Sequence, residues 1–445
     1  MDAEAVVENV GRDAGILMPQ QNIAIIGAGP KAAALAAKAY CLQQKGKPIT
    51  VSVFERSEVG ANWNGKHGYT DGQQRLCTPA ERDLGFPYLA PFGDDVAALM
   101  QERFSWNAFL VAQADRADRY SDWVNRGRRP PSHSEFADYL AFAFERAGVV
   151  PAIGRATKLI RSDDTWSVRQ IDHATKDVVE FQDFHGVVIT GPGPASKKPV
   201  QVNDMRVLSG VDFWSSLSRV RRLLASGLKD NPVVIIGGGG TAAAITAWFI
   251  REGVRHQPIV LLNNQAMLFT RTTNFFENSL FDDEETWLAL APKDRTEFTR
   301  RLNRGVVWET VTQLLTDADN LTLVPGQAKE VRHAPGSTGR LPDLEVVYEN
   351  QKGVHPLAAG LVVDATGFDS WSFEALLPDD MRIATAAAQR EQLMRDMRPD
   401  LSLPLDAWPR VHVPNLSDAI GPGYGSLMVL GAGADRMLQP YYDAA

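Results

Sequence analysis

Two glycine-rich fingerprints mark this chain, one beginning at Gly27 and the other at Gly237, about 210 residues apart. Each follows a short apolar run rich in β-branched residues and leads into an alanine-rich stretch of helical character. A glycine loop between a strand and a helix lets the backbone approach a pyrophosphate, which lies at the helix N-terminus. The repeat therefore predicts an α/β chain with two Rossmann-like dinucleotide-binding domains, and hydride transfer between two dinucleotides.

The first fingerprint follows an expected strand over residues 23–26 and has the pattern G-x-G-x-x-A. A second expected strand, 50–54, ends at Glu55, where a carboxylate suits a ribose hydroxyl. This context favours a dinucleotide site over an incidental glycine turn. The loop residues expected to contact the dinucleotide are Gly27, Gly29, Pro30, Lys31 and Ala32.

The second fingerprint follows residues 233–236, and the next expected strand, 258–262, ends in Asn263 and Asn264 without a carboxylate. An acidic residue there would favour NAD, so its absence leaves room for the extra phosphate of NADPH. Arg271 is the nearest downstream cation and the candidate phosphate partner, unless it is a solvated loop arginine. The expected loop contacts are Gly237, Gly239, Gly240 and Thr241.

Composition narrows the class of protein. A net charge of −8 argues against a nucleic-acid partner. No apolar run approaches the roughly 20 residues of a membrane span, and the acidic N-terminal segment lacks the pattern of a signal peptide, so we expect a cytoplasmic protein. Cys41 and Cys77 have neither disulfide-framework nor metal-site spacing, and no metal is expected. Cys41 is expected to be a buried apolar residue of the first helix.

Three regions are expected along the chain. The first dinucleotide-binding domain takes residues 1–200 and 405–445, and the second takes 201–265 and 320–368. Residues 266–319 and 369–404 are assigned to a mainly helical substrate-binding region. Residues 420–426 are interpreted either as a glycine loop that leads into a last helix whose positive end faces an electron-rich ring edge, or as a plain glycine turn before a packing helix.

Several longer blocks are more specific than any glycine pattern. In these blocks the chain resembles, over nearly its whole length, the flavin-dependent N-hydroxylating monooxygenases of siderophore biosynthesis, above all the mycobactin-type L-lysine N6-hydroxylases. The blocks are residues 59–63, 69–72, 82–88, 275–281, 303–307 and 365–368.

The resemblance assigns FAD to the first fingerprint and Glu55, and NADPH to the second. It implies that Asn62 and Trp63 pack beside the flavin and that Arg75 and Thr78 lie along its isoalloxazine ring. The substrate carboxylate would meet Arg82, whose planar fork suits it. The remaining implied pocket residues are Asn278 and Asn303, which are the catalytic candidates that face substrate and nicotinamide, and Ser426.

Three of these assignments have a simpler alternative. Arg82 beside Asp83 has the spacing of a surface ion pair. Asn278 has the character of a residue that caps a turn, and Trp63 that of a core residue.

The implied reaction uses NADPH to reduce FAD, and a C4a-hydroperoxyflavin formed with molecular oxygen to hydroxylate a primary amine. Only the neutral amine has a free lone pair, and a lysine amine has a pKa of about 10.4, so the site must favour deprotonation. Aromatic residues of the insertion are expected to supply a desolvating pocket, without a nucleophile or a dedicated acid–base pair. They are Phe275, Phe276, Phe281 and Trp287.

Three other functions stay open. A flavin monooxygenase of sulfides or ketones would share both fingerprints, but residues 207–214 lack the F-x-G-x-x-x-H stretch typical of that group. The others are an electron-transfer reductase and a catalytically silent nucleotide-binding protein. The substrate is also open between lysine, ornithine, a diamine and another amino acid, because one methylene is worth only about 1–3 kcal/mol. The family suggests a homo-oligomer.

Overall fold

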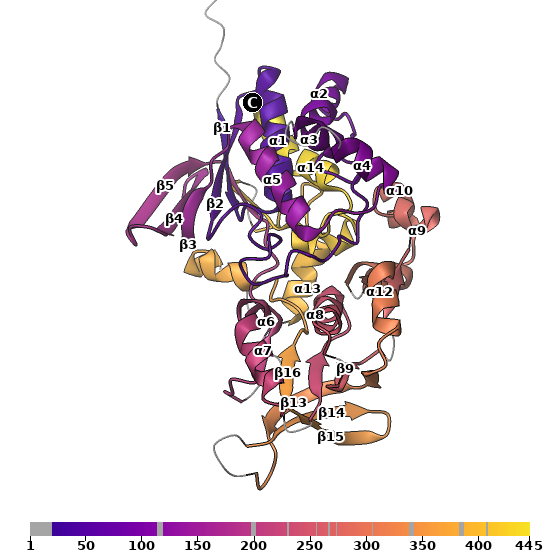
Figure 1. Ribbon diagram of the computed structural model, residues 1–445. Coiled ribbons are helices and arrows are strands. Elements are labelled where there is room, and N and C mark those ends of the chain that lie inside the picture. Colours follow the sequence, from indigo (N-terminus) through magenta and orange to yellow (C-terminus); the bar gives the residue numbers. More distant parts are fainter. Residues whose placement is uncertain are drawn as a thin grey trace, which may run out of the picture.

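A computed structural model shows two α/β units and a helical insertion in the second unit that packs against the first (Figure 1). For residues 302–304 it describes the backbone but not the side chains. The described residues are 20–113, 119–196, 202–228, 231–254, 256–265, 268–272, 274–304, 306–337, 342–381, 387–405 and 408–445.

The first unit contains a seven-stranded sheet of order β17-β6-β1-β2-β3-β4-β5. Neighbouring strands from β17 to β3 pair in parallel, and β4 and β5 extend the sheet antiparallel. The strands are β1 Gln21–Ile26, β2 Ile49–Glu55, β3 Ala152–Ser162, β4 Thr165–Asp172, β5 Val178–Phe184, β6 Gly186–Ile189 and β17 Arg410–His412.

Helix α1, Pro30–Gln44, is buried along most of its length, because its alanines let other helices approach closely. It packs between α5 and α14. Cys41 lies fully buried on it, as predicted, and burial raises the pKa of its thiol to about 12. The other helices of this unit are α2 Asp94–Phe104, α3 Trp106–Ala112, α4 Arg119–Asn125, α5 His133–Ala147 and α14 Leu430–Ala444.

The second unit contains a parallel five-stranded sheet of order β12-β9-β8-β16-β7. Its central strands are buried on both faces, so they are continuous apolar runs. The strands are β7 Val207–Ser209, β8 Val233–Ile236, β9 Ile259–Asn263, β12 Leu321–Pro325 and β16 Leu361–Asp364.

Helices cover one face of this second sheet, and a small antiparallel sheet covers the other. The helices are α6 Gly210–Ser215, α7 Leu217–Ala225 and α8 Gly240–Arg251. The small sheet is β13 Gln327–His333, β14 Leu344–Asn350 and β15 Gly353–Ala359. The two Rossmann-like units predicted from the fingerprints are thus confirmed.

The insertion is mainly helical, as predicted, with two short parallel strands that the sequence did not indicate. Its apolar side chains pack against Met428, Val429 and Ala432 near the chain end. Its elements are β10 Phe269–Arg271, α9 Phe275–Ser279, α10 Glu284–Ala289, α11 Pro292–Phe298, the π-helix η2 Thr299–Arg304, β11 Val306–Trp308 and α12 Glu309–Thr316.

The described part of residues 369–404, which the sequence-based division assigned to the substrate region, contributes to the core of the first unit. Their apolar side chains Phe373, Leu377, Met397, Leu401 and Leu403 join that core. The elements here and just beyond are η3 Ser372–Leu376, η4 Asp379–Met381, α13 Ala387–Arg395 and η5 Pro414–Ala419.

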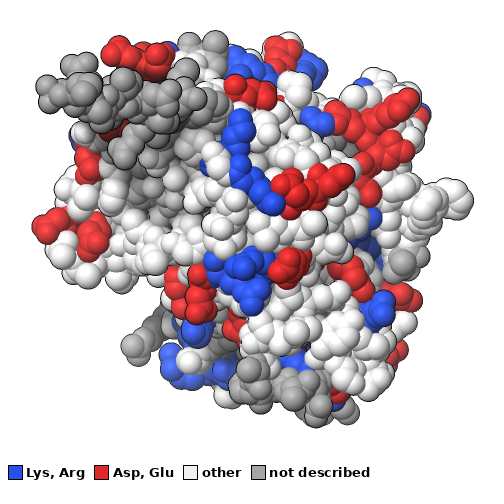
Figure 2. Space-filling view, turned by 90° about the horizontal axis from the view of Figure 1, so that it is seen from above, with Lys and Arg blue, Asp and Glu red and all other residues white. Residues whose placement is uncertain are grey.

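The surface carries charges of both signs. On the face seen in Figure 2, described Lys and Arg side chains are interspersed with Asp and Glu rather than forming one continuous basic area. Within the described part of the chain, every helix falls short of the length and apolarity that a bilayer crossing requires.

Candidate functional site

The first fingerprint forms a tight loop between β1 and α1. Gly27 has a φ of +103°, and a Cβ there would lie 2.6 Å from Thr190 Oγ1. Gly29 is the N-cap of α1 and Pro30 its first residue, and no side chain caps this helix end. The first backbone N–H groups of α1 therefore suit an outside anion such as a pyrophosphate.

Glu55 lies at this loop, as its spacing predicted. Its Oε2 accepts from the N–H of Ala28 at 2.8 Å, and its Oε1 accepts from the N–H of Ser57 at 2.9 Å. Carboxylate oxygens have further lone pairs, so a ribose hydroxyl fits here as well. The N–H of Gly60 donates to the carbonyl of Ala28, which brings the segment with Asn62 and Trp63 beside the fingerprint.

Three residues with predicted FAD contacts also have protein partners. Trp63 packs edge-on against His133, with ring centroids 4.9 Å apart. Arg75 Nη1 donates to the carbonyl of Pro130 at 2.7 Å. Lys31 Nζ donates to Asn415 Oδ1 at 3.1 Å and ties α1 to the segment before α14. Their cofactor roles stay predictions.

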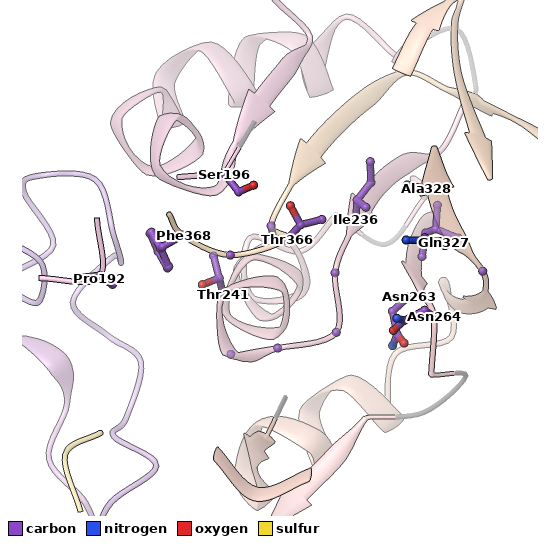
Figure 3. Close-up of a pocket in the computed structure, with 18 of the residues that line it drawn as sticks. Pro192, Ser196, Ile236, Thr241, Asn263, Asn264, Gln327, Ala328, Thr366 and Phe368 are labelled. Atoms are coloured by element: carbon purple, nitrogen blue, oxygen red, sulfur yellow. The ribbon is translucent and has the colours of Figure 1, made fainter. Parts of the chain in front are cut away.

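The second fingerprint borders a cavity of about 710 Å³ at the carboxyl ends of β8, β9 and β16 (Figure 3). Gly237 has a φ of +131°, and a Cβ there would lie 2.5 Å from the carbonyl oxygen of Ala365. The N-terminus of α8 at Gly239 has no side-chain cap, so it suits a second pyrophosphate. All four predicted loop residues line this cavity: Gly237, Gly239, Gly240 and Thr241.

Arg271 lies elsewhere. It is absent from the described residues that line the cavity, none of which is a lysine or arginine. Pairing of β10 with β11 places its guanidinium in the interior, 2.9 Å from Met428 Sδ and 4.7 Å from the ring centre of Phe281. Burial lowers the pKa of Arg271 to about 10. Neither the predicted phosphate contact nor the solvated-loop alternative matches this position.

Arg82 lies between the first unit and the insertion. Its Nη1 donates to the carbonyl of Met428 at 3.1 Å, and its Nη2 donates to the carbonyl of Asn278 at 3.2 Å. Thr78 Oγ1 lies 3.8 Å from the sulfur of the same methionine. Three predicted residues, Thr78, Arg82 and Asn278, are therefore brought together with the buried Arg271.

The ion pair of Arg82 with Asp83 that the sequence left open is not formed. The carboxylate of Asp83 instead accepts from the N–H groups of Gly85 and Trp106 and from the hydroxyl of Tyr88. Burial still raises the pKa of Asp83 to about 6, because desolvation outweighs these bonds. Asp83 thus organises the loop that carries Arg82.

Asn278 is not the cap of α9, because Asn274 fills that position. Ser426 Oγ donates to the carbonyl of Gly423 at 2.9 Å and so stabilises its own turn. Asn303 lies in η2, and its side chain is outside the described features. The substrate roles of these three residues stay predictions.

The aromatic pocket is smaller than predicted. Phe275 and Phe276 are 77% and 79% exposed at the start of α9, so they do not desolvate an internal site. Phe281 and Trp287 are buried as expected and pack with Phe298 near Met428.

Comparison with known proteins identifies the family. The family described as L-lysine 6-monooxygenase/L-ornithine 5-monooxygenase matches residues 90–369. The chain is 34% identical over 431 residues to L-lysine N6-monooxygenase MbtG of Mycolicibacterium paratuberculosis, with 94% of each chain covered. The protein of that name from Mycobacterium tuberculosis shows the same identity and coverage. The chain belongs to this family.

Solved structures agree with this placement. Lysine monooxygenase NbtG of Nocardia farcinica, which has an NADPH domain, is 28% identical, with a TM-score of 0.74 over 94% of this chain and 99% of its own. The ornithine N-hydroxylase KtzI of Kutzneria, described with reduced FAD, NADP⁺ and L-ornithine, has a TM-score of 0.70 over 95% and 99%. At 18% identity it supports the fold alone.

Sequence reasoning missed two residues of this site, Met428 and Asp282. Met428 contacts Thr78, Arg82 and Arg271. Asp282 lies 3.6 Å from Arg82. Neither belongs to a recognisable motif, since they meet Arg82 only through the docking of the insertion and the chain end.

Proposed function

We propose that this chain is an FAD- and NADPH-dependent monooxygenase that uses molecular oxygen to hydroxylate the side-chain amine of L-lysine. The product would be a precursor of siderophore hydroxamates. The observation that carries the proposal is the 34% identity to L-lysine N6-monooxygenases over 94% of the chain. The two fingerprint loops and the guanidinium of Arg82 support it, because they suit two dinucleotides and the carboxylate of an amino acid.

The cofactors are assigned by fit. FAD would lie at the first fingerprint with Glu55, and NADPH in the cavity that Gly237 and Thr241 line. When bound, a flavin accepts hydride from the nicotinamide and activates oxygen for transfer to a nucleophile. The chain must orient both rings and exclude water from the reacting atoms.

The substrate amine must lose its proton to react. Burial and positive charge both lower the pKa of an ammonium group. The cluster around Met428 offers both, because Phe281 is buried there and the guanidinium of Arg271 is almost fully enclosed. We assign Arg271 to this electrostatic role rather than to the NADPH phosphate.

The test is hydroxylamine formation from lysine, ornithine and cadaverine by the FAD-loaded protein, with NADPH and with NADH. We expect product from lysine with NADPH. Consumption of NADPH that yields only hydrogen peroxide with every amine would overturn the proposal. A protein that takes up no FAD would favour the silent nucleotide-binding alternative. The cytoplasmic location and the homo-oligomer stay predictions.

A further inference from the structure

Two opposite charges meet where the insertion docks on the first unit. Arg82 comes from the loop between β2 and α2, and Asp282 from the turn between α9 and α10. Their nearest atoms, Arg82 Nη2 and Asp282 Oδ1, lie 3.6 Å apart. The side chains are 11% and 27% exposed, so this ion pair is mostly buried but still partly accessible to solvent.

Both groups keep binding capacity. A guanidinium has five N–H donors, and Arg82 donates through two nitrogens to the carbonyls of Met428 and Asn278. An ionised carboxylate has about four acceptor positions, and the distance of 3.6 Å leaves its contact with Arg82 loose.

A small molecule can reach Asp282 from a cavity, and Arg82 lies directly behind Asp282 without being among the described residues that line this cavity. Asp282 lines a cavity of about 800 Å³ between the insertion and α14, together with Phe281, Tyr424 and Ala432. This cavity is separate from the one at the second fingerprint, with which it shares no lining residue among those described.

We propose that Asp282 binds the α-ammonium group of the amino-acid substrate while Arg82 binds its α-carboxylate. This inference rests on the function proposed above and extends it to the head group. A zwitterion presents both charges within a few ångströms of each other, as the protein pair does. A substrate with the carboxylate but without the ammonium group would place a negative charge beside Asp282. A diamine would place a positive charge beside Arg82.

A positioning role for Asp282 makes a different prediction. If the carboxylate of Asp282 only orients Arg82, its loss would weaken the binding of every substrate that carries a carboxylate, whether or not an α-amine is present. If it binds the ammonium, its loss would weaken lysine alone. The matched pair of substrates is therefore lysine and ε-aminocaproate, which is lysine without the α-amine.

The experiment compares kcat/KM of the FAD-loaded wild type and Asp282→Asn for these two substrates. We expect the value for lysine to fall about tenfold or more, and that for ε-aminocaproate to stay or rise. Asp283→Asn is the control, because it removes the neighbouring carboxylate while asparagine still caps α10. An equal fall for both substrates, or no fall for lysine, overturns the inference.

A binding measurement separates this inference from the proposed function. Calorimetric titration of lysine into the FAD-loaded protein reports the head-group contact without turnover. If lysine binding depends on Asp282 but the protein forms no hydroxylamine, the proposed function is contradicted and this inference is not. Hydroxylation of lysine that is insensitive to Asp282→Asn would sink the inference alone, and a wild type that neither binds nor hydroxylates lysine would sink both. Asp282→Glu, which keeps the charge, should retain a preference for lysine and guards against misfolding of the amide variant.

Discussion

Arg251 at the end of α8 donates to the carboxylate of Asp71 in the first unit, with Nη2 and Oδ2 2.5 Å apart. Nearby, the rings of Tyr69 and Phe368 stack with centroids 5.9 Å apart. The N-terminus of the same helix α8 forms the second fingerprint. These contacts join the helix that begins at the second fingerprint loop to the first unit, so they would also set how a dinucleotide in the second loop approaches one in the first.

The first prediction concerns this contact. Asp71→Asn should slow the reduction of bound FAD by NADPH, because a looser α8 holds the nicotinamide less well against the flavin. A double-mutant cycle that combines Asp71→Asn with Arg251→Gln should give an interaction free energy of about 0.5–3 kcal/mol between the two side chains, measured by urea unfolding. Stopped-flow absorbance measures the reduction rate. Arg221→Gln is the control, because it breaks an exposed pair with Glu252 at the same end of the helix. Equal reduction rates in Asp71→Asn and this control would exclude the role.

A second prediction tests the FAD loop. Gly27→Ala should lower the affinity for FAD, because the new Cβ would overlap Thr190 Oγ1 and adds backbone strain of about 1–3 kcal/mol. Flavin absorbance of the purified protein and titration with FAD give the measurement. Gly46→Ala has a positive φ too but meets nothing within 4 Å, so it controls for strain alone. Normal FAD binding by Gly27→Ala would place the cofactor elsewhere.

The third prediction concerns Arg82. Its replacement by Ala should raise the dissociation constant of lysine about tenfold or more, because charge-assisted hydrogen bonds of about 1.5–3 kcal/mol each are lost. NADPH oxidation should change far less, since the NADPH cavity does not include Arg82. Calorimetry and initial rates measure the two effects. Equal losses of lysine binding and NADPH oxidation would remove the carboxylate role.

The fourth prediction is a pH dependence of stability. Burial lowers the pKa of His133 to about 4 from its ordinary 6.5, beside Trp63 and Thr70. Between these values the unfolded chain binds a proton that the folded chain does not, so the free energy of unfolding falls as the pH is lowered. His133→Asn should reduce this fall, measured by urea unfolding at about pH 7 and about pH 5. Parallel pH curves for the variant and the wild type would contradict it.

The features predicted correctly from the sequence are local ones. A fingerprint loop and the carboxylate of Glu55 are fixed by a strand, a turn and a helix that are close in the chain, so spacing alone places them. The cluster around Met428 combines three distant segments. No spacing rule brings Met428 to Arg82, which lies more than three hundred residues earlier.

The same argument explains the wrong predictions. Arg271 is the last residue of β10, a strand that the sequence did not indicate, and the pairing of β10 with β11 turns the guanidinium inward. Phe275 and Phe276 are as apolar as Phe281, and only the docking of α9 decides which ring is covered. The sequence shows which side chains the insertion contains, but only the packing of the insertion against the first unit determines which of them line the site.

The last prediction concerns the buried ion pair that joins α1 to α14. Lys38 Nζ lies 2.6 Å from Asp435 Oδ1, and the side chains are 1% and 6% exposed. Lys38→Met leaves a buried carboxylate without its cation, which costs about 3–5 kcal/mol, whereas the double variant Lys38→Met, Asp435→Leu removes both charges and should recover much of that loss. Urea unfolding measures each variant, with Arg126→Gln, which breaks an exposed helical pair worth about 0.3–0.5 kcal/mol, as the control. A double variant as unstable as the sum of its single changes would mean that the two charges do not interact.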